Sequence, residues 1–116
     1  MLKDNFYHIT AESAGEYTIA FDAQHAIFKA HFPGKPIVPG ACLVQMAQEM
    51  ASLWLQKTII FTQIDNLKFL KLVTPDVAPT FQFEAKEDHK IRVSVMANAI
   101  NYANFTATYM CTDSDL

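Results

Sequence analysis

Several residue types and patterns are scarce in this chain, and each scarcity excludes a class of protein or site. The 116 residues include only two cysteines, Cys42 and Cys111, so the sequence predicts free thiols rather than a disulfide framework. No spacing of His, Cys, Asp and Glu is typical of a metal site, and we expect neither a metal nor another cofactor. No apolar run reaches the roughly 18 residues of a membrane-spanning helix, and residues 1–5 do not resemble a signal peptide. These absences favour a cytoplasmic protein.

Charge is scarce as well, and positive charge most of all. Nine Lys and Arg residues stand against twelve Asp and Glu residues, and the net charge of −3 argues against nucleic-acid binding, which needs a basic surface. Hydrophobic residues, by contrast, make up 51% of the chain. The length predicts a single domain, 1–116, and the apolar surplus favours a homodimer or a higher oligomer.

The hydrophobic periodicity predicts strands on both sides of one helix. Residues 16–22 alternate apolar and polar side chains and are expected to pair with residues 6–11, since Ala14-Gly15 is typical of a turn. A short helical turn is expected at residues 25–29. Further strands are predicted at residues 61–73, 80–85, 91–97 and 102–111. The predicted fold is therefore α+β, an antiparallel sheet of about five to six strands wrapped around one long helix.

The helix predicted for residues 40–56 is the most strongly periodic element. Apolar side chains recur at i, i+3 and i+4 from Leu43 through Leu53 to Trp54, and small or apolar residues also occupy most of the opposite side. A helix that is apolar nearly all round is typical of a protein centre, so we expect it to be buried on all sides. Cys42 lies within it and is expected to be a small buried hydrophobic residue rather than a nucleophile.

A stiff loop with one titratable side chain leads into this helix: His31-Phe32-Pro33-Gly34-Lys35-Pro36-Ile37-Val38-Pro39-Gly40. Three prolines and two glycines within residues 33–40 exclude regular structure. The loop delivers His31 to the N-terminus of a helix, which is a plausible way to build a reaction centre.

This loop resembles the active-site signature of bacterial 3-hydroxyacyl-acyl-carrier-protein dehydratases of the hot-dog fold (FabZ/FabA-like). Lys68-Phe69 and the later Val73, Pro75 and Asp76 are similar to the segment that follows the helix in that family, and the order of elements agrees. The resemblance implies a sheet curved around the central helix, and two subunits that join their sheets edge to edge. It also implies active sites between subunits, and a substrate held on the phosphopantetheine arm of acyl carrier protein.

The family's chemistry corresponds to three places in this chain. Dehydration needs a base for the C2 proton, a group that polarises the thioester carbonyl, and an acid for the departing hydroxyl. The resemblance gives His31 the role of base, and gives the backbone N–H of Gly40 or Ala41 the role of hydrogen-bonding the thioester oxygen. The family's acidic position is Gln45 here. As a catalytic candidate, its amide can hydrogen-bond and position a water or a hydroxyl group, but it cannot donate a proton as an acid does.

Each of the other candidate residues has two interpretations. Glu49, one turn after Gln45, is either a displaced acid or a solvated or dimer-facing carboxylate. An acyl tunnel would be lined by residues that are equally typical of a core: Phe28, Phe32, Ile37, Met46 and Met50.

Charged and titratable residues without a motif are expected at the surface. The histidines in this group are His8, His25 and His89. Five basic residues are either merely solvated or meet the acidic carrier protein or the pantetheine phosphate: Lys35, Lys57, Lys68, Lys71 and Arg92.

Three functions fit these residues. The first is a hydro-lyase, a dehydratase-like enzyme of fatty-acid or related lipid or polyene biosynthesis. The second is a non-catalytic protein that binds acyl carrier protein or completes the site of an active paralogue in a heterodimer, which Gln45 favours. The third and least favoured is an acyl thioesterase on the same fold, since fold alone does not decide function.

Overall fold

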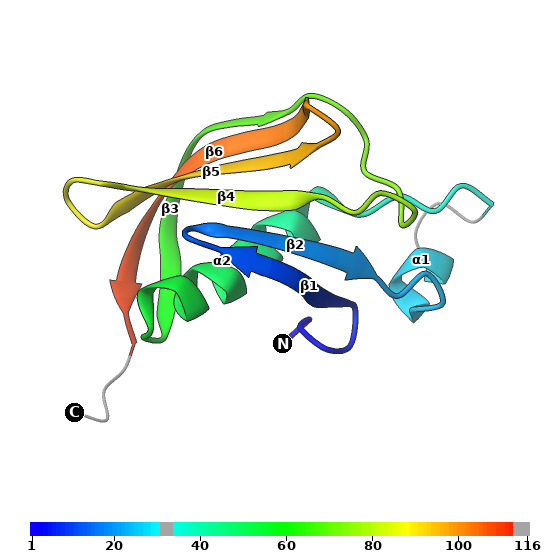
Figure 1. Ribbon diagram of the computed structural model, residues 1–116, viewed down its shortest axis with the longest axis horizontal. Coiled ribbons are helices and arrows are strands. Elements are labelled where there is room, and N and C mark those ends of the chain that lie inside the picture. Colours follow the sequence, from blue (N-terminus) through cyan, green and yellow to red (C-terminus); the bar gives the residue numbers. More distant parts are fainter. Residues whose placement is uncertain (31–33, 113–116) are drawn as a thin grey trace.

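A computed structural model of the chain describes residues 1–30 and 34–112, which contain six strands and two helices (Figure 1). Strands β1 (Tyr7–Ser13) and β2 (Glu16–Phe21) form the first hairpin, and the short helix α1 (Ala26–Ala30) follows them. The long helix α2 (Gly40–Leu55) precedes β3 (Ile59–Phe69), β4 (Thr80–Lys86), β5 (Lys90–Ala97) and β6 (Ile100–Cys111). The predicted order of two strands, one long helix and four strands is confirmed.

The six strands form one sheet in the order β1-β2-β4-β5-β6-β3, and all neighbouring pairs are antiparallel. Figure 1 shows α2 lying along the inside of this curved sheet, with β3 running back from its C-terminal end. Among the described residues, β3 has a neighbour on one side only, although it is eleven residues long. The sheet therefore ends on a long edge strand.

Alternation along the strands builds the core against α2. In β2 the buried side chains are Tyr17, Ile19 and Phe21, as predicted, and the residues between them are more exposed. The predicted inward face of β5 is confirmed in the same way: Ile91, Val93 and Val95 are buried. These side chains join the apolar face of α2 in one hydrophobic cluster.

The burial of α2 is one-sided, which corrects the expectation that it is covered all round. Its buried side chains are Leu43, Met46, Ala47, Glu49, Met50 and Ala51. Ala41 and Gln45 are exposed, and Leu53 of the predicted apolar stripe keeps 45% of its surface exposed. A single sheet contacts only one side of a helix, so small or apolar residues on the other side stay uncovered. No helix in the described ranges is long and apolar enough to cross a membrane.

Several element boundaries differ from the predicted ones because turns decide them. Helix α2 ends at Leu55, since Gln56 adopts a left-handed conformation with φ 57° and its N–H donates to the Leu53 carbonyl. Strand β3 spans 59–69 instead of 61–73. Strand β6 begins at Ile100, two residues early, because Asn98 and Ala99 both have positive φ and close a two-residue hairpin turn.

Side chains of α2 occupy the first part of the outer edge of β3. Gln48 Oε1 accepts a hydrogen bond from the Phe61 N–H at 2.8 Å, and Ser52 Oγ accepts one from the Ile59 N–H at 3.2 Å. These two backbone groups thus bond to the helix instead of to a neighbouring strand. Further along, β3 carries the exposed side chains of Leu67 and Phe69. The edge is therefore closed at its start and open at residues 63–69.

Candidate active site

The N-terminus of α2 offers backbone donors without partners. Pro39 caps the helix in an extended conformation, and its carbonyl accepts the N–H groups of Cys42 at 2.9 Å and Leu43 at 3.2 Å. The N–H groups of Gly40 and Ala41 have no acceptor in residues 1–30 and 34–112. The first N–H groups of a helix lie at the positive end of its dipole and suit an oxygen that gains negative charge. Their predicted role at a thioester oxygen stays a prediction, and this geometry permits it.

An apolar cavity lies beside these donors. It has a volume of about 360 Å³ and is lined by Ile37, Val38, Pro39, Gly40, Leu43, Phe69, Lys71, Leu72 and Val73. The Phe69 ring covers Gly40 so closely that a Cβ built on the glycine would lie 2.6 Å from the ring's Cζ. The missing side chain at Gly40 thus lets an aromatic ring approach the helix terminus. Mostly apolar walls with a few polar groups are typical of ligand sites.

The loop before α2 is described only in part. His31 and Phe32 lie outside the described residues, so their roles as base and tunnel residue stay predictions. From Gly34, which has φ 84°, the chain runs in irregular structure to Pro39. The buried Val38 holds residues 34–39 in place, since its N–H donates to the Val73 carbonyl at 2.8 Å. The end of the signature loop is thereby tied to the segment that follows β3.

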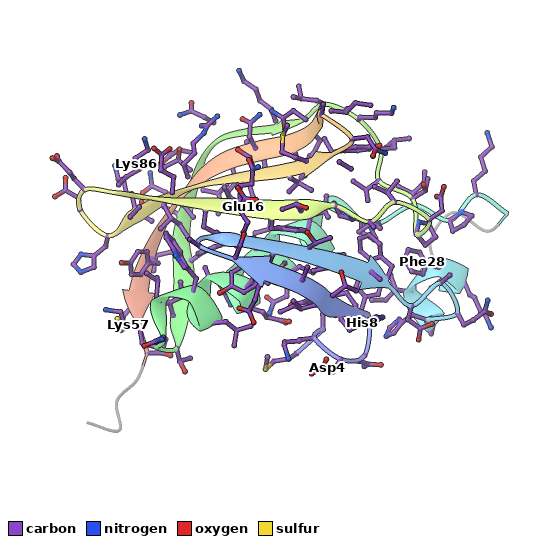
Figure 2. The ribbon with its side chains drawn as sticks, viewed as in Figure 1. Asp4, His8, Glu16, Phe28, Lys57 and Lys86 are labelled. Atoms are coloured by element: carbon purple, nitrogen blue, oxygen red, sulfur yellow. The ribbon has the colours of Figure 1, made fainter. Side chains whose placement is uncertain are left out.

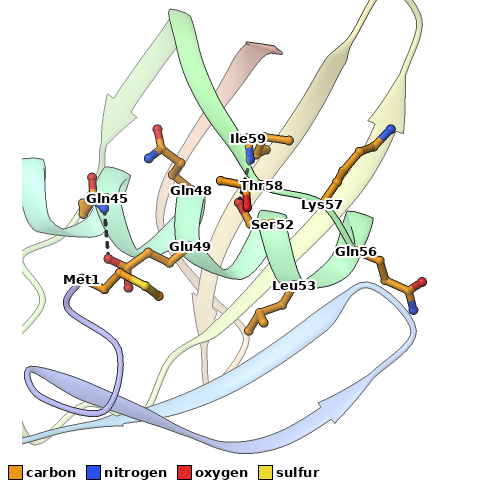
Figure 3. Close-up of a pocket in the computed structure, with 10 residues that line it drawn as sticks. All are labelled: Met1, Gln45, Gln48, Glu49, Ser52, Leu53, Gln56, Lys57, Thr58 and Ile59. Atoms are coloured by element: carbon orange, nitrogen blue, oxygen red, sulfur yellow. Dashed lines mark hydrogen bonds between the residues drawn. The ribbon is translucent and has the colours of Figure 1, made fainter. Parts of the chain in front are cut away.

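Gln45 and Glu49 form a hydrogen-bonded pair one turn apart on α2 (Figure 3). Gln45 Nε2 donates to Glu49 Oε2 at 2.9 Å. Gln45 is exposed, whereas Glu49 keeps only 6% of its surface exposed. The interpretation of Glu49 as a solvated carboxylate is therefore wrong, because the chain's first residues cover it.

Four donors surround the Glu49 carboxylate, two on each oxygen. Oε2 accepts from Gln45 and from the Leu2 N–H at 2.8 Å. Oε1 accepts from the Lys3 N–H at 2.9 Å and from the Tyr7 hydroxyl at 3.0 Å. A buried carboxylate needs such partners, since burial without them would disfavour its charge.

These donors decide the charge state of Glu49. Burial raises the pKa of its carboxyl, but the hydrogen bonds from the four donors together outweigh burial, and the pKa lies below its ordinary value of 4.5. Burial and the adjacent carboxylate raise the pKa of the Tyr7 hydroxyl well above its ordinary value, so it stays a donor. Glu49 is thus an anion at neutral pH, and an anion accepts hydrogen bonds but has no proton to give.

A second cavity, of about 700 Å³, follows α2 towards the start of β3 (Figure 3). Its lining residues are Met1, Gln45, Gln48, Glu49, Ser52, Leu53, Gln56, Lys57, Thr58 and Ile59. Figure 3 shows Gln45 with its nitrogen directed at Glu49 and its oxygen turned away from it. The wall of this cavity therefore includes an amide of defined orientation.

The predicted tunnel residues do not gather around one cavity. Met46 and Met50 have no exposed surface and lie in the core, on the sheet side of α2. Phe28 of α1, labelled in Figure 2, is also buried and stacks on Phe6 with ring centroids 5.1 Å apart. Of the four tunnel residues that the structure describes, Ile37 alone lines the cavity beside Gly40. The other three are buried in the core, and Phe28 also lines a separate cavity of about 330 Å³ beside Gly34 and Pro36.

The remaining histidines take different places. His8, on β1 in Figure 2, and His89 are exposed, as predicted. His25 is partly buried, which corrects its expected surface position. Its Nδ1 accepts the Ile27 N–H at 3.1 Å at the start of α1, and its ring lies 5.2 Å from that of Phe6. Its role is therefore structural.

The cysteines are free thiols, as predicted. Cys42 is half-buried, and burial raises its pKa, which makes it a poor nucleophile. Cys111 is exposed at the end of β6. No cluster of His, Cys, Asp and Glu that could hold a metal occurs within the described ranges.

Sequence reasoning missed the residues that hold Glu49. Leu2 and Lys3 act through backbone N–H groups, which no side-chain pattern marks. Tyr7 carried a weak signal, because an aromatic hydroxyl on the buried side of a strand needs a partner. Phe69 was noted only as part of a family likeness, and its contact with Gly40 needs the three-dimensional structure.

The family model and the curated proteins that match this chain are dehydratases. Residues 8–106 match the family model described as ApeI-like, ApeI dehydratase. Among curated proteins, the chain is similar to the 3-hydroxyacyl-[acyl-carrier-protein] dehydratase FabZ of Erythrobacter litoralis, with 37% identity over 95 residues covering 69% of this chain and 63% of that protein. It is 33% identical to FabZ of Sinorhizobium medicae, over 65% of this chain and 53% of that protein. The chain thus spans less than two thirds of the length of these relatives.

Solved structures show the fold. The dehydratase heterocomplex ApeI:P from Xenorhabdus doucetiae matches with a TM-score of 0.73 and 20% identity, over 90% of this chain and 94% of that one. A hypothetical thioesterase from Streptococcus pneumoniae with coenzyme A matches with a TM-score of 0.63 and 14% identity, over 95% and 91%. At these identities the likeness establishes the predicted hot-dog fold and leaves the activity to the residues of the site.

Proposed function

The chain belongs to the ApeI-like dehydratase family, and on that premise we propose that it acts in removing water from 3-hydroxyacyl thioesters held by acyl carrier protein. One observation carries the proposal. The unpartnered N–H groups of Gly40 and Ala41 stand beside an apolar cavity, at the end of the signature loop. A pair of backbone N–H donors next to apolar walls suits a thioester carbonyl oxygen with an acyl chain attached.

The proposed reaction uses the two kinds of group that the signature supplies. His31 takes a proton from C2, and the electron pair of that bond forms the C2–C3 double bond. The Gly40 and Ala41 N–H groups hydrogen-bond the thioester oxygen, on which negative charge gathers during proton removal. The C3–O bond breaks, and the hydroxyl leaves as water after it takes up one proton, either from the His31 imidazolium formed in the first step or from an acidic residue of a partner chain. Gln45 cannot be the source of that proton, because an amide is not an acid in this range of pH.

The absence of an acidic side chain at position 45 favours a second candidate function. In it, this chain is one half of a two-chain dehydratase. In that arrangement the partner supplies the acidic residue, and this chain supplies the loop and the helix N-terminus. Two observations support it: Gln45 itself, and a fold relative that is a dehydratase heterocomplex. An acyl thioesterase stays the least favoured alternative, since the thioesterase match shares 14% identity and hence the fold alone.

Contacts with partners are part of the same proposal. The open edge of β3, with Leu67 and Phe69 exposed, is where a second sheet would add its strand. Lys71 lines the cavity beside Gly40 and is exposed, so it is the best placed of the candidate lysines for a pantetheine phosphate. A cytoplasmic location and the exact lipid pathway stay predictions of the sequence.

The test compares wild type, His31→Ala and Gln45→Glu on 3-hydroxyacyl-carrier-protein substrates, with dehydration and the reverse hydration followed by mass spectrometry. We expect turnover by the wild type, alone or with a paralogue, and at least a hundredfold loss in His31→Ala, the order of a general-base contribution. Unchanged activity in His31→Ala would remove His31 from the role of base.

Gln45→Glu separates the two candidates. If the wild type alone is inactive and Gln45→Glu is active, the chain by itself lacks only the acid, and the two-chain candidate gains. A co-purification for a second hot-dog protein then identifies the partner. If no combination of wild type and paralogue turns over or binds any 3-hydroxyacyl thioester, the proposed function is wrong.

A further inference from the structure

The hydrogen bond between Gln45 and Glu49 decides which end of the Gln45 amide faces outward. A side-chain amide has a donor end and an acceptor end of nearly equal shape, and either end fits most sites. The ionised carboxylate of Glu49 only accepts hydrogen bonds, so the Nε2 end faces it at 2.9 Å. The Oε1 end is left turned away from Glu49, as Figure 3 shows.

Glu49 is itself held in place, so it is a fixed reference for the amide. Three of its four donors are independent of Gln45: the N–H groups of Leu2 and Lys3 and the hydroxyl of Tyr7. The carboxylate is 6% exposed and cannot rotate without breaking these bonds. An exposed glutamine would otherwise sample many rotamers. The pair thus converts a flexible surface side chain into an oriented one.

Resting on the proposed function, in which Gln45 stands at the acidic position, we propose that Glu49 is a positioning residue that makes Gln45 a hydrogen-bond acceptor for the substrate's 3-hydroxyl group. Gln45 Oε1 accepts the hydroxyl hydrogen, and no bond to Glu49 needs to break for it to do so. The hydroxyl is oriented with its lone pairs free. The proton that completes the departing water then comes from the His31 imidazolium or from an acidic residue of a partner chain, not from Gln45.

The spacing of residues along α2 agrees with this assignment. Gln45 belongs to the wall of the 700 Å³ cavity, whereas the unpartnered amides of Gly40 and Ala41 lie one turn or more earlier on the same helix. Ala41 and Gln45 are both exposed and are four residues apart, so they share a face of α2. About 6 Å of helix axis separates them. A thioester oxygen at Ala41 and a hydroxyl group near Gln45 are thus compatible with one short substrate.

The first test concerns the free protein and needs no substrate. The side-chain NH₂ signals of Gln45 are assigned by nitrogen-15 NMR, using Gln45→Met as the variant that lacks them. In wild type we expect one of the two protons to be shifted downfield and slowed in exchange by its bond to the carboxylate. Glu49→Gln should abolish the shift, and the control Tyr7→Phe should keep it. Free-amide signals in wild type, unaltered by Glu49→Gln, would overturn the proposal.

The second test measures the preference for a hydroxyl group. Calorimetry compares 3-hydroxybutyryl-pantetheine with butyryl-pantetheine, which differ only in that group. Wild type and Tyr7→Phe should bind the hydroxyl compound about threefold to tenfold more tightly, as expected for one hydrogen bond. Gln45→Met should lose this preference while still binding both, and Glu49→Gln should lose most of it. Gln45→Met keeps the other three donors of Glu49, so it stays informative even if Glu49→Gln fails to fold.

The outcomes separate this inference from the proposed function. A hydroxyl preference that survives in Gln45→Met overturns the role of Gln45 and leaves the dehydratase proposal standing. Failure of wild type, alone and with a paralogue, to bind either thioester overturns the proposed function and the role of Gln45 together. In that case the amide signals still report whether Glu49 orients Gln45.

Discussion

At the residue scale, Glu49 connects the stability of the protein to pH. Its pKa is lowered in the folded chain, so the unfolded chain takes up the proton first as pH falls. The stabilisation is therefore fully present above the unfolded value of about 4.5 and is lost as pH falls through the folded value. The hydrogen bonds of one carboxylate thereby set part of the acid limit of the whole chain.

This gives a measurable difference between wild type and Glu49→Gln. At pH 7 we expect the variant to be less stable by about 1–3 kcal/mol, because charge-assisted hydrogen bonds in a buried site are lost. The difference should shrink as pH is lowered from about 5 towards 3. Urea denaturation at several pH values measures it. The control Glu87→Gln, at an exposed hairpin tip, should stay within about 0.5 kcal/mol of wild type. A wild-type advantage that is constant with pH would contradict the assignment.

Residue roles divided into those that the sequence predicted and those that it did not. The departure at Gln45 was visible in the sequence, since the position is fixed by its spacing from His31. Helical spacing placed Glu49 on the same side of α2 as Gln45, but neither their hydrogen bond nor the burial of Glu49 was predicted. That burial comes from residues 1–3, which are far from α2 in sequence and reach it only after the chain folds.

At the element scale, α2 and β3 depend on each other beyond simple packing. The side chains of Gln48 and Ser52 occupy two outward N–H groups of β3 that an edge strand would otherwise expose. An unpaired N–H group on an edge strand can bond to a strand of another chain. The two bonds from α2 therefore restrict the part of β3 at which a partner strand can pair. The helix thus sets the register available to a second sheet.

Gln48→Met tests this connection, because it keeps the side-chain length and removes the acceptor. We expect a loss of about 1 kcal/mol in the free energy of unfolding. Amide exchange at Phe61 should become faster while exchange at Ile59 stays the same. Ser52→Ala should show the opposite pattern, with Ile59 affected and Phe61 unaffected. Hydrogen exchange followed by NMR separates the two, and equal protection of Phe61 in wild type and Gln48→Met would disprove the edge bond.

Elements themselves were well predicted where a strong period exists. Alternation located β2, β4 and β5 to within about a residue, because one face of each is buried. The start of β6 was displaced, because the predicted turn at Asn98 is only two residues long, with positive φ at Asn98 and Ala99. The one-sided burial of α2 depends on how many layers cover it, which periodicity does not report.

At the scale of the whole molecule, four of the nine exposed large hydrophobic side chains of the described residues lie on or just after the open part of the edge strand β3. Leu67 and Phe69 of β3 are 42% and 52% exposed, and Leu70 and Leu72 just after it are 56% and 67% exposed. Such side chains on an edge strand and the segment after it favour association with another sheet. We therefore expect a dimer or heterodimer to form at this edge.

Leu67→Lys should weaken that association. A charge on the open edge must be desolvated when a second strand pairs with it, so we expect a tenfold or greater rise in the dissociation constant. Light scattering coupled to size-exclusion chromatography measures the mass over a range of concentrations. Ile100→Lys, which changes a similarly exposed residue outside the edge, is the matched control. Equal masses for both variants at every concentration would place the interface elsewhere.

The overall fold was accessible from the sequence, and the complete site was not. Element order and one signature loop predicted the hot-dog arrangement, which the fold relatives confirm. The loop's own histidine lies outside the described residues, and its neighbours across the site come from another subunit if the family pattern holds. A site divided between two different chains leaves only part of its residues in either sequence.

The support of Glu49 has one more consequence, for how sequences of this kind can diverge. Two of the four donors are main-chain groups of residues 2 and 3, so they do not depend on which side chains stand there. Any amino acid except proline supplies the same N–H. The side chains of residues 2 and 3 can therefore change while the ionised carboxylate stays held by the same two bonds. Sequence comparison would see variation there, although the interaction itself had not changed.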